Sequence, residues 1–192
     1  MIRRGPDGQG KYRSEDDKLG FIHRRLAIID PVPRSDQPMI APKSGITIVY
    51  NGEVYNFRQL RKYLQQKYSL SFRTESDTEV ILLGYEVEGK AFIKKLEGMF
   101  ALAIWDPLKT KLLLARDAFG IKPLYYSKKS ESIVFASTVK ALAGSCAGEA
   151  LDYNGDSEII FLITGSVPEP ATIYEGINCV EAASIYEIDG RG

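Results

Sequence analysis

The order in which hydrophobic periods follow one another along the 192 residues is the strongest constraint on the fold. A β-rich group comes first, two helix-period segments follow it, and a second β-rich group comes after them. Short connections between the later strands favour antiparallel pairing. This order predicts an α+β fold in layers, in which helices lie on antiparallel sheets.

The expected strands are short apolar stretches bounded by turn residues, at residues 20–30, 46–50, 99–105, 111–115, 124–127, 133–137 and 184–188. Asn51-Gly52 directly follows the second of these stretches and predicts a hairpin turn, after which Val54-Tyr55 resumes β character. Residues 1–18 are rich in glycine and charge and predict a loop, while the prolines of residues 31–45 predict a long surface connection.

Three helices are expected. Asn56 can cap the first, whose apolar face carries Leu60, Tyr63, Leu64 and Tyr68. Ser76 can start the second, with Glu79 at the spacing of a capping box, and its apolar stripe continues to Phe92 and Leu96. The third covers residues 157–164.

Composition limits the partners and the location that we expect. Lys plus Arg and Asp plus Glu number 25 each, so the formal net charge is zero and predicts no nucleic-acid or membrane partner. No apolar run is long enough to span a bilayer, and the first seven residues lack the apolar core of a secretory signal. We therefore expect a cytoplasmic protein. Cys146 and Cys179 could form one disulfide, although two buried or free thiols fit that location better.

Polar motifs follow one another in a definite order, namely RGPDG at residues 4–8, HRRLAIID at 23–30, YNGEVYN at 50–56, SDTE at 76–79, GMFALAIWD at 98–106 and ARDAFGIKPLYY at 115–126. This series resembles the glutaminase domain of class II glutamine amidotransferases, specifically the asparagine synthetase branch. Pro6 supports that branch, because relatives that make amino sugars or purine precursors usually carry another residue there. The resemblance implies one type-2 glutamine amidotransferase domain over residues 1–192. It also implies an Ntn-hydrolase-like αββα four-layer sandwich of two antiparallel sheets.

The motif residues suit a site for free glutamine, which needs a cation for the α-carboxylate, an anion for the α-ammonium and donors for the amide oxygen. The guanidinium of Arg25 can grip a carboxylate with two nitrogens. Asp77 and Glu53 are the candidates for the ammonium, and the side-chain amide of Asn51 with the backbone N–H of Gly52 can form an oxyanion hole. The resemblance implies the same roles and adds Leu26 and Ile28 to the glutamine-binding residues.

Each of these residues also has a structural interpretation. Asn51-Gly52 is a common turn, Asp77 suits the first turn of a helix because of the helix dipole, and Arg25 alone could be a surface arginine. His23 is the single histidine and could act as a base. The resemblance implies that a terminal amine is the base, so we expect His23 to be a structural strand residue. Arg116-Asp117 and Lys122-Pro123 are expected in structural turns, and could meet a partner domain.

The nucleophile of the family is an N-terminal cysteine, whose thiolate attacks the glutamine amide. Only residues 1–3 precede Arg4 here, and Cys146 and Cys179 match no catalytic position. We therefore expect a domain that is incomplete at its N-terminus, lacks the first strand of one sheet and is inactive as a glutaminase. A further departure is Glu181-Ala182-Ala183, which stands where the family often has Pro-Pro-Gly.

The resemblance implies L-glutamine and an ATP-binding synthetase domain or subunit as partners. No pyrophosphate loop of the Ser-Gly-Gly-x-Asp-Ser type occurs in the sequence, so ATP and Mg²⁺ are expected only in that other domain, and no cofactor or metal in this one. The first hypothesis is a truncated amidotransferase whose parent makes asparagine from aspartate, glutamine and ATP. The alternatives are a non-catalytic glutamine-binding or regulatory module, and a remnant whose exposed strand edge favours aggregation or a homodimer.

Overall fold

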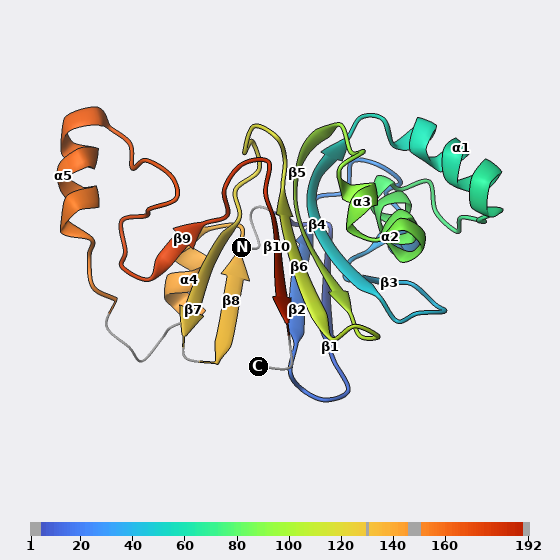
Figure 1. Cartoon of the computed structure of the whole chain (residues 1–192), viewed down its shortest axis with the longest axis horizontal. Coiled ribbons are helices and arrows are strands. Elements are labelled where there is room, and N and C mark those ends of the chain that lie inside the picture. The colour runs from blue at the N-terminus through green and yellow to red at the C-terminus, as the bar shows by residue number, and fades with distance from the viewer. Residues whose placement is uncertain (1–4, 130, 146–150, 190–192) are drawn as a thin grey trace.

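A five-stranded antiparallel sheet forms the centre of the molecule (Figure 1). The structure, a computed structural model, describes residues 5–129, 131–145 and 151–189. The strands lie in the order β10-β6-β5-β4-β3. Their bounds are β3 (Met39–Ile40), β4 (Thr47–Val54), β5 (Gly98–Asp106), β6 (Lys111–Arg116) and β10 (Ile185–Asp189).

Three helices cover one face of this sheet, as Figure 1 shows. They are α1 (Phe57–Tyr68), α2 (Asp77–Glu88) and α3 (Lys90–Ile93). Apolar side chains from both layers form the main core, among them Ile48, Leu64, Ile81, Phe92 and Leu102. Burial of these side chains is the main force that holds the helices on the sheet.

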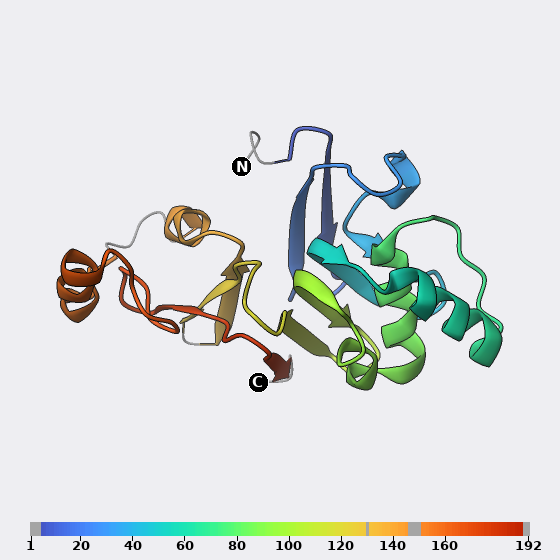
Figure 2. The ribbon, with the colours of Figure 1, turned by 90° about the horizontal axis from the view of Figure 1, so that it is seen from above.

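Two smaller antiparallel sheets lie on the other face (Figure 2). One pairs β1 (Gly8–Arg13) with β2 (Gly20–Arg25), and the other has the order β8-β7-β9, formed by β7 (Tyr125–Lys129), β8 (Ser132–Ala136) and β9 (Ile177–Cys179). A second core joins them to the central sheet and includes Phe21, Ala103, Trp105, Leu114 and Leu124. Helix α4 (Val139–Ser145) contacts β7 and β8, and helix α5 (Gly155–Thr164) projects away from the sheets.

A cavity of about 520 Å³ separates β2 from β8. Each strand pairs on one side only among the described residues, so the edges that face the cavity are unpaired there. The rings of Phe21 and Phe135 meet across the gap, with centroids 5.8 Å apart. The expected layered fold with antiparallel sheets is confirmed.

The loop expected over residues 1–18 is wrong for its middle part, because β1 occupies Gly8–Arg13. Every residue of β1 pairs with β2, from Gly8 opposite Arg25 to Arg13 opposite Gly20. The strand therefore depends on its neighbour and not on its own composition, which contains few β-formers. Arg4 and Cys146 lie outside the described residues.

The hairpin expected at Asn51-Gly52 is also wrong, because both residues lie inside β4. Gly52 pairs with Phe100 of β5, and a Cβ added to Gly52 would lie 2.1 Å from the carbonyl oxygen of Met99. Glycine is needed here for the close approach of two backbones and not for a turn.

The starts of α1 and α2 are confirmed, whereas the helix expected over residues 157–164 begins at Gly155, after the cap Asn154; part of the expected capping is also absent. Asn56 precedes α1 without capping it, since its side chain bonds Lys95 and Glu97 instead. The Ser76 hydroxyl accepts from the N–H of Thr78, 3.0 Å away, and caps α2. The Glu79 carboxylate bonds Thr74 and not Ser76, so the reciprocal half of the capping box is absent.

The apolar stripe expected to run through residue 96 is divided between two helices. Gly89, at φ +62°, ends α2 after Glu88, and α3 begins at Lys90. The short elements β3, β9, α3 and α4 were not expected from the sequence. Among the described residues, no helix is both long enough and apolar enough to cross a membrane.

Candidate functional site

One pocket of about 300 Å³ brings all the predicted site residues together. Its lining includes Arg25, Leu26, Ile28, Asn51, Gly52, Glu53 and Asp77. These residues come from the end of β2, the loop after it, the second half of β4 and the start of α2. The shared cavity that the glutamine-site hypothesis requires is therefore present.

The backbone N–H of Gly52 points to the open edge of β4. In a strand, alternate N–H groups face the same edge. The N–H groups of Tyr50 and Val54 donate to Gln37 Oε1 (2.6 Å) and Asp77 Oδ2 (3.2 Å), on the edge away from β5. Phe100, opposite Gly52, turns its own N–H and carbonyl to Asp117. The Gly52 N–H is thus left at the pocket, with no acceptor among the described residues.

Asn51 and Glu53 lie on the opposite face of β4 from Tyr50, because side chains alternate along a strand. Asn51 is exposed and Glu53 is half-buried. Within the described part of the chain, neither side chain makes a hydrogen bond or an ion pair. An uncommitted amide and an uncommitted carboxylate therefore flank the Gly52 N–H.

Asp77 is held by a buried tyrosine. The Tyr50 hydroxyl donates to Asp77 Oδ2 at 2.7 Å, and both residues are at most 5% exposed. Burial raises the pKa of Asp77, while the bonds from the Tyr50 hydroxyl and the Val54 N–H act in the opposite direction. Burial, followed by the neighbouring Asp77 carboxylate, raises the pKa of Tyr50, so Tyr50 stays a donor. Because burial removes water from the Asp77 carboxylate, a positively charged group of a ligand would stabilise the ionised form of Asp77.

Arg25 is buried and fastens the loop that follows β2. Its Nη1 donates to the Val32 carbonyl and to Asp36, and its Nη2 donates to the carbonyls of Ile29 and Asp30. The terminal nitrogens predicted to grip a carboxylate are thus engaged, which leaves the Nε–H without a partner among the described residues. The guanidinium, which forms an ion pair with Asp36, holds the loop from Ile29 to Val32 at the pocket. The side chains of Leu26 and Ile28, earlier in the same loop, are 58% and 74% exposed.

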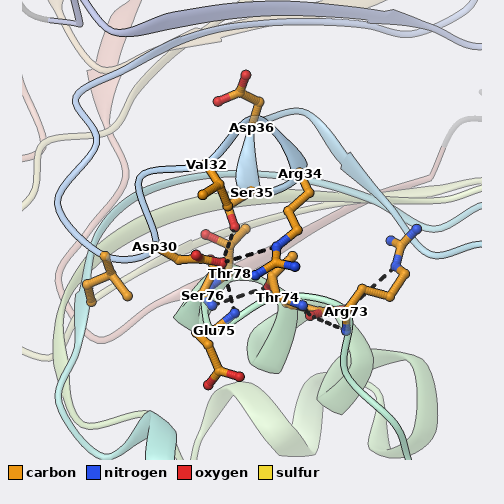
Figure 3. A network of polar contacts seen from close by, with 12 residues as sticks. Asp30, Val32, Arg34, Ser35, Asp36, Arg73, Thr74, Glu75, Ser76 and Thr78 are labelled. Atoms are coloured by element: carbon orange, nitrogen blue, oxygen red, sulfur yellow. Dashed lines mark hydrogen bonds and ion pairs between the residues drawn. The ribbon is translucent and has the colours of Figure 1, made fainter.

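A second set of contacts ties this loop to the start of α2, as Figure 3 shows. Asp30 Oδ2 accepts from the Ser35 hydroxyl at 2.7 Å and from the Glu75 N–H at 2.9 Å. The Ser35 and Glu75 bonds lower the pKa of Asp30. These bonds join the loop to the start of α2. They therefore hold Arg25 and Asp77 in fixed positions relative to each other at the pocket.

His23 lines the pocket and contacts the backbone of β4. Its Nε2 lies 3.1 Å from the Tyr50 carbonyl, so the ring donates there, and its buried Nδ1 has no partner among the described residues. Burial lowers the pKa of His23, because a charged ring would leave the Nδ1 proton unbonded. The geometry agrees with the structural role expected for it.

Sequence reasoning missed three contributors to the pocket: Tyr50, Gln37 and Lys122. Tyr50 begins the YNGEVYN motif, but its residue type indicates no role there, and Gln37 belongs to no motif. Only the fold places Tyr50 against Asp77 and Gln37 against β4. Lys122 was expected in a structural turn, and Asp117 does build that turn with four backbone N–H bonds, from Phe100, Phe119, Ile121 and Lys122. The Lys122 ammonium has no anion or acceptor in the part of the chain that the structure describes.

Comparison with known proteins decides the family. The model of the glutamine amidotransferase domain matches residues 1–192. The chain belongs to the glutamine amidotransferase domain family. Among curated relatives, asparagine synthetase [glutamine-hydrolyzing] 1 of Bacillus subtilis (strain 168) is 38% identical over 192 residues, which is all of this chain and 29% of that protein. Asparagine synthetase [glutamine-hydrolyzing] 3 of the same organism is 38% identical over 187 residues, 95% of this chain and 30% of that protein.

A solved structure supports the fold of this glutamine amidotransferase domain. The allosteric regulatory enzyme of purine biosynthesis superposes with a TM-score of 0.62 at 22% identity, over 90% of this chain and 34% of that one. At that identity the likeness concerns the fold alone. The domain spans about 30% of the length of the curated relatives named above.

The described residues offer this domain no thiol at the pocket. Cys179 is a free, buried thiol that contacts Arg116 Nη1, and burial raises the pKa of the thiol to about 11. A thiol with such a pKa is protonated at neutral pH and is a poor nucleophile. No group of three or more His, Cys, Asp or Glu side chains among the described residues could hold a metal ion.

Proposed function

We propose that this domain binds free L-glutamine in the 300 Å³ pocket and is the glutamine-binding part of an ATP-dependent amidotransferase that makes asparagine. The observation that carries the proposal is the unpaired Gly52 N–H, which lies beside two uncommitted side chains, Asn51 and Glu53. An edge strand can leave its N–H groups to solvent, so the Gly52 N–H supports the proposal because it faces a pocket in which neighbouring polar groups also lack partners among the described residues.

The bound molecule would use each group once. Its amide oxygen accepts from the Gly52 N–H and the Asn51 amide, which also suit an oxyanion. Its α-ammonium meets the carboxylates of Glu53 and Asp77. Its α-carboxylate lies by the positive charge of Arg25 and Lys122, and the methylene groups lie against the exposed side chains of Leu26 and Ile28.

We further propose that these 192 residues bind glutamine without hydrolysing it, because no thiol among the described residues lines the pocket. The attacking group would come from a segment that lies outside them. The cavity between β2 and β8 suits such a segment, since it shares His23, Arg24, Tyr50 and Asn51 with the glutamine pocket. The absence of a thiol also suits a second candidate function, a non-catalytic glutamine-binding module that pairs with a synthetase subunit.

Titration calorimetry with L-glutamine tests the pocket. We expect saturable heat with L-glutamine, and none with butyramide, which keeps the amide but lacks both charged groups. Glu53→Gln should weaken binding about tenfold or more, since a charge-assisted hydrogen bond contributes roughly 1.5–3 kcal/mol. Glu97→Gln is the matched control, because Glu97 is exposed and lies outside the pocket. Absence of heat and of a thermal shift at millimolar L-glutamine would refute the assignment.

An ammonia-release assay tests the second part of the proposal. We expect no ammonia above the rate without protein. Steady turnover by the purified chain would show that a nucleophile is present within the 192 residues. A saturable calorimetric signal with zero turnover is the combination that supports binding without hydrolysis.

A further inference from the structure

Helix α5 is well formed, but its apolar side chains belong to neither hydrophobic core of the described residues. Asn154 Oδ1 caps its start by accepting from the Ser157 N–H at 2.9 Å, and Gly165, at φ +77°, closes its end with an N–H bond to the Phe161 carbonyl. The five residues 159–163 (IIFLI) are all exposed, up to 82% for Leu162 and 78% for Ile163. A helix that is apolar all round is normally buried.

The helix stands at the end of an arm, residues 151–176, which Figures 1 and 2 show extended away from the central sheet. Tyr153 and Tyr174 form an isolated antiparallel bridge at the base of the arm, and their rings stack with centroids 5.2 Å apart. Arg116 fastens the return segment, since it pairs with Glu169 at 2.8 Å and donates to the Val180 carbonyl at 2.7 Å. The arm is therefore held at its root while its apolar tip stays open.

The charge of the arm indicates which kind of partner could cover the apolar side chains of α5. Residues 151–176 contain no Lys, Arg or His. Asp156 and Glu158 are exposed on the helix, and Asp152 and Glu175 are exposed at the base of the arm. A surface helix that binds an anionic membrane carries basic residues, so this one is unsuited to it. Two copies packed through α5 would bring the same acidic side chains together. The partner that fits the arm best is a different protein surface, with Lys or Arg side chains around an apolar contact area.

We propose that α5 docks into an apolar groove, bordered by Lys or Arg side chains, on the synthetase region that accompanies this domain in the longer protein. This rests on the proposed function, which requires such a region. The curated relatives carry about 70% of their length outside the match, which is ample surface for an interface. Apolar side chains at the centre and charges at the edge are the usual arrangement of a protein–protein interface.

Hydrogen exchange of the α5 amides tests the proposal. The isolated chain is compared with Bacillus subtilis asparagine synthetase 1 in which this chain replaces the region that it matches. We expect amides of residues 159–163 to exchange at least tenfold more slowly in the chimera. Leu162→Ser with Ile163→Ser should remove most of that protection, whereas Leu108→Ser, an equally exposed leucine far from the arm, should leave it unchanged. Asp156→Asn with Glu158→Gln should weaken it most at low salt.

The unaltered Bacillus subtilis protein gives an independent measurement, which stands if the chimera does not fold. Its segment aligned with α5 should be protected to a similar degree. Equal exchange with and without the synthetase region would overturn the proposal. So would protection of the isolated chain that grows with its own concentration, or on vesicles containing phosphatidylglycerol. Glutamine calorimetry on the same samples reports the proposed function separately, because docking is read from exchange alone.

Discussion

Replacement of Tyr50 by phenylalanine isolates one bond at the centre of the site. The hydroxyl of Tyr50 donates to Asp77 Oδ2 at 2.7 Å, and Tyr50 is 5% exposed. A hydrogen bond to a charged group contributes about 1.5–3 kcal/mol, and the Val54 N–H remains on the same oxygen, so we expect a loss near the middle of that range. A loss of about 2 kcal/mol is roughly a thirtyfold change in the unfolding equilibrium.

The pH dependence of this loss identifies the partner. The hydroxyl stabilises the charged form of Asp77, so Tyr50→Phe should raise the pKa of Asp77 further above its ordinary value. The loss should be full above the folded-state pKa of Asp77. It should shrink as the pH falls through that pKa, because the protonated carboxyl makes only a neutral hydrogen bond with tyrosine.

Urea unfolding of the wild type and Tyr50→Phe at neutral pH and near pH 4 measures both quantities. Tyr85→Phe is the matched control, because Tyr85 is also 5% exposed and its hydroxyl makes no hydrogen bond to the described residues. That control should stay within about 0.5 kcal/mol of the wild type. The reasoning fails if Tyr50→Phe loses no more than Tyr85→Phe, or if its loss is the same at both pH values.

Three further substitutions test the backbone and the buried histidine. Gly52→Ala should lower the free energy of unfolding by about 1–3 kcal/mol, because the added Cβ would lie 2.1 Å from the Met99 carbonyl oxygen. Urea unfolding measures this loss, with Gly144→Ala as the control, because a Cβ at Gly144 meets nothing within 4 Å. Equal effects of the two substitutions would contradict the prediction. Ala183→Gly should stabilise by roughly 0.5–1 kcal/mol in thermal unfolding, because Ala183 has φ +57° and glycine tolerates that conformation, while an unchanged midpoint would argue against strain. Because the pKa of His23 is lowered in the folded state, the unfolded chain takes up a proton below about pH 6.5 before the folded chain does. The contribution of neutral His23 to the free energy of unfolding is therefore complete above that pH and declines as the pH falls through the folded-state pKa. His23→Gln should flatten this part of the urea-midpoint profile, and an identical slope would exclude His23 as its source.

The resemblance recognised in the ordered motifs predicted the pocket better than the local patterns predicted some of the elements in it. Arg25, Asn51 and Asp77 were chosen for the chemistry of a free amino acid, and the fold places them around one cavity. In contrast, Asn51-Gly52 predicted a turn and lies in a strand. The turn signal is local, whereas the pairing with β5 is formed by residues about fifty positions away along the chain.

Arg25 and Gly52 show that residue type alone does not reveal which hydrogen-bond donors stay free in the folded chain. The guanidinium was expected to bind a ligand with its terminal nitrogens, but four acceptors of the chain hold them. The Gly52 N–H was expected to be free, and its freedom follows from strand alternation and from the bonds of its neighbours. Which donors remain for a ligand depends on which acceptors the folded chain brings near.

The sequence by itself determined the layered antiparallel fold, the starts of α1 and α2 and the choice of Arg25, Asn51, Glu53 and Asp77 as polar side chains of one pocket, because hydrophobic period and residue chemistry are local properties. Only the tertiary structure decided that Tyr50 supports Asp77, that Lys122 joins the pocket, that β1 is a strand and that α5 is left uncovered. Each of these depends on contacts between segments far apart in the chain, and burial and hydrogen-bond pairing arise only when those segments meet.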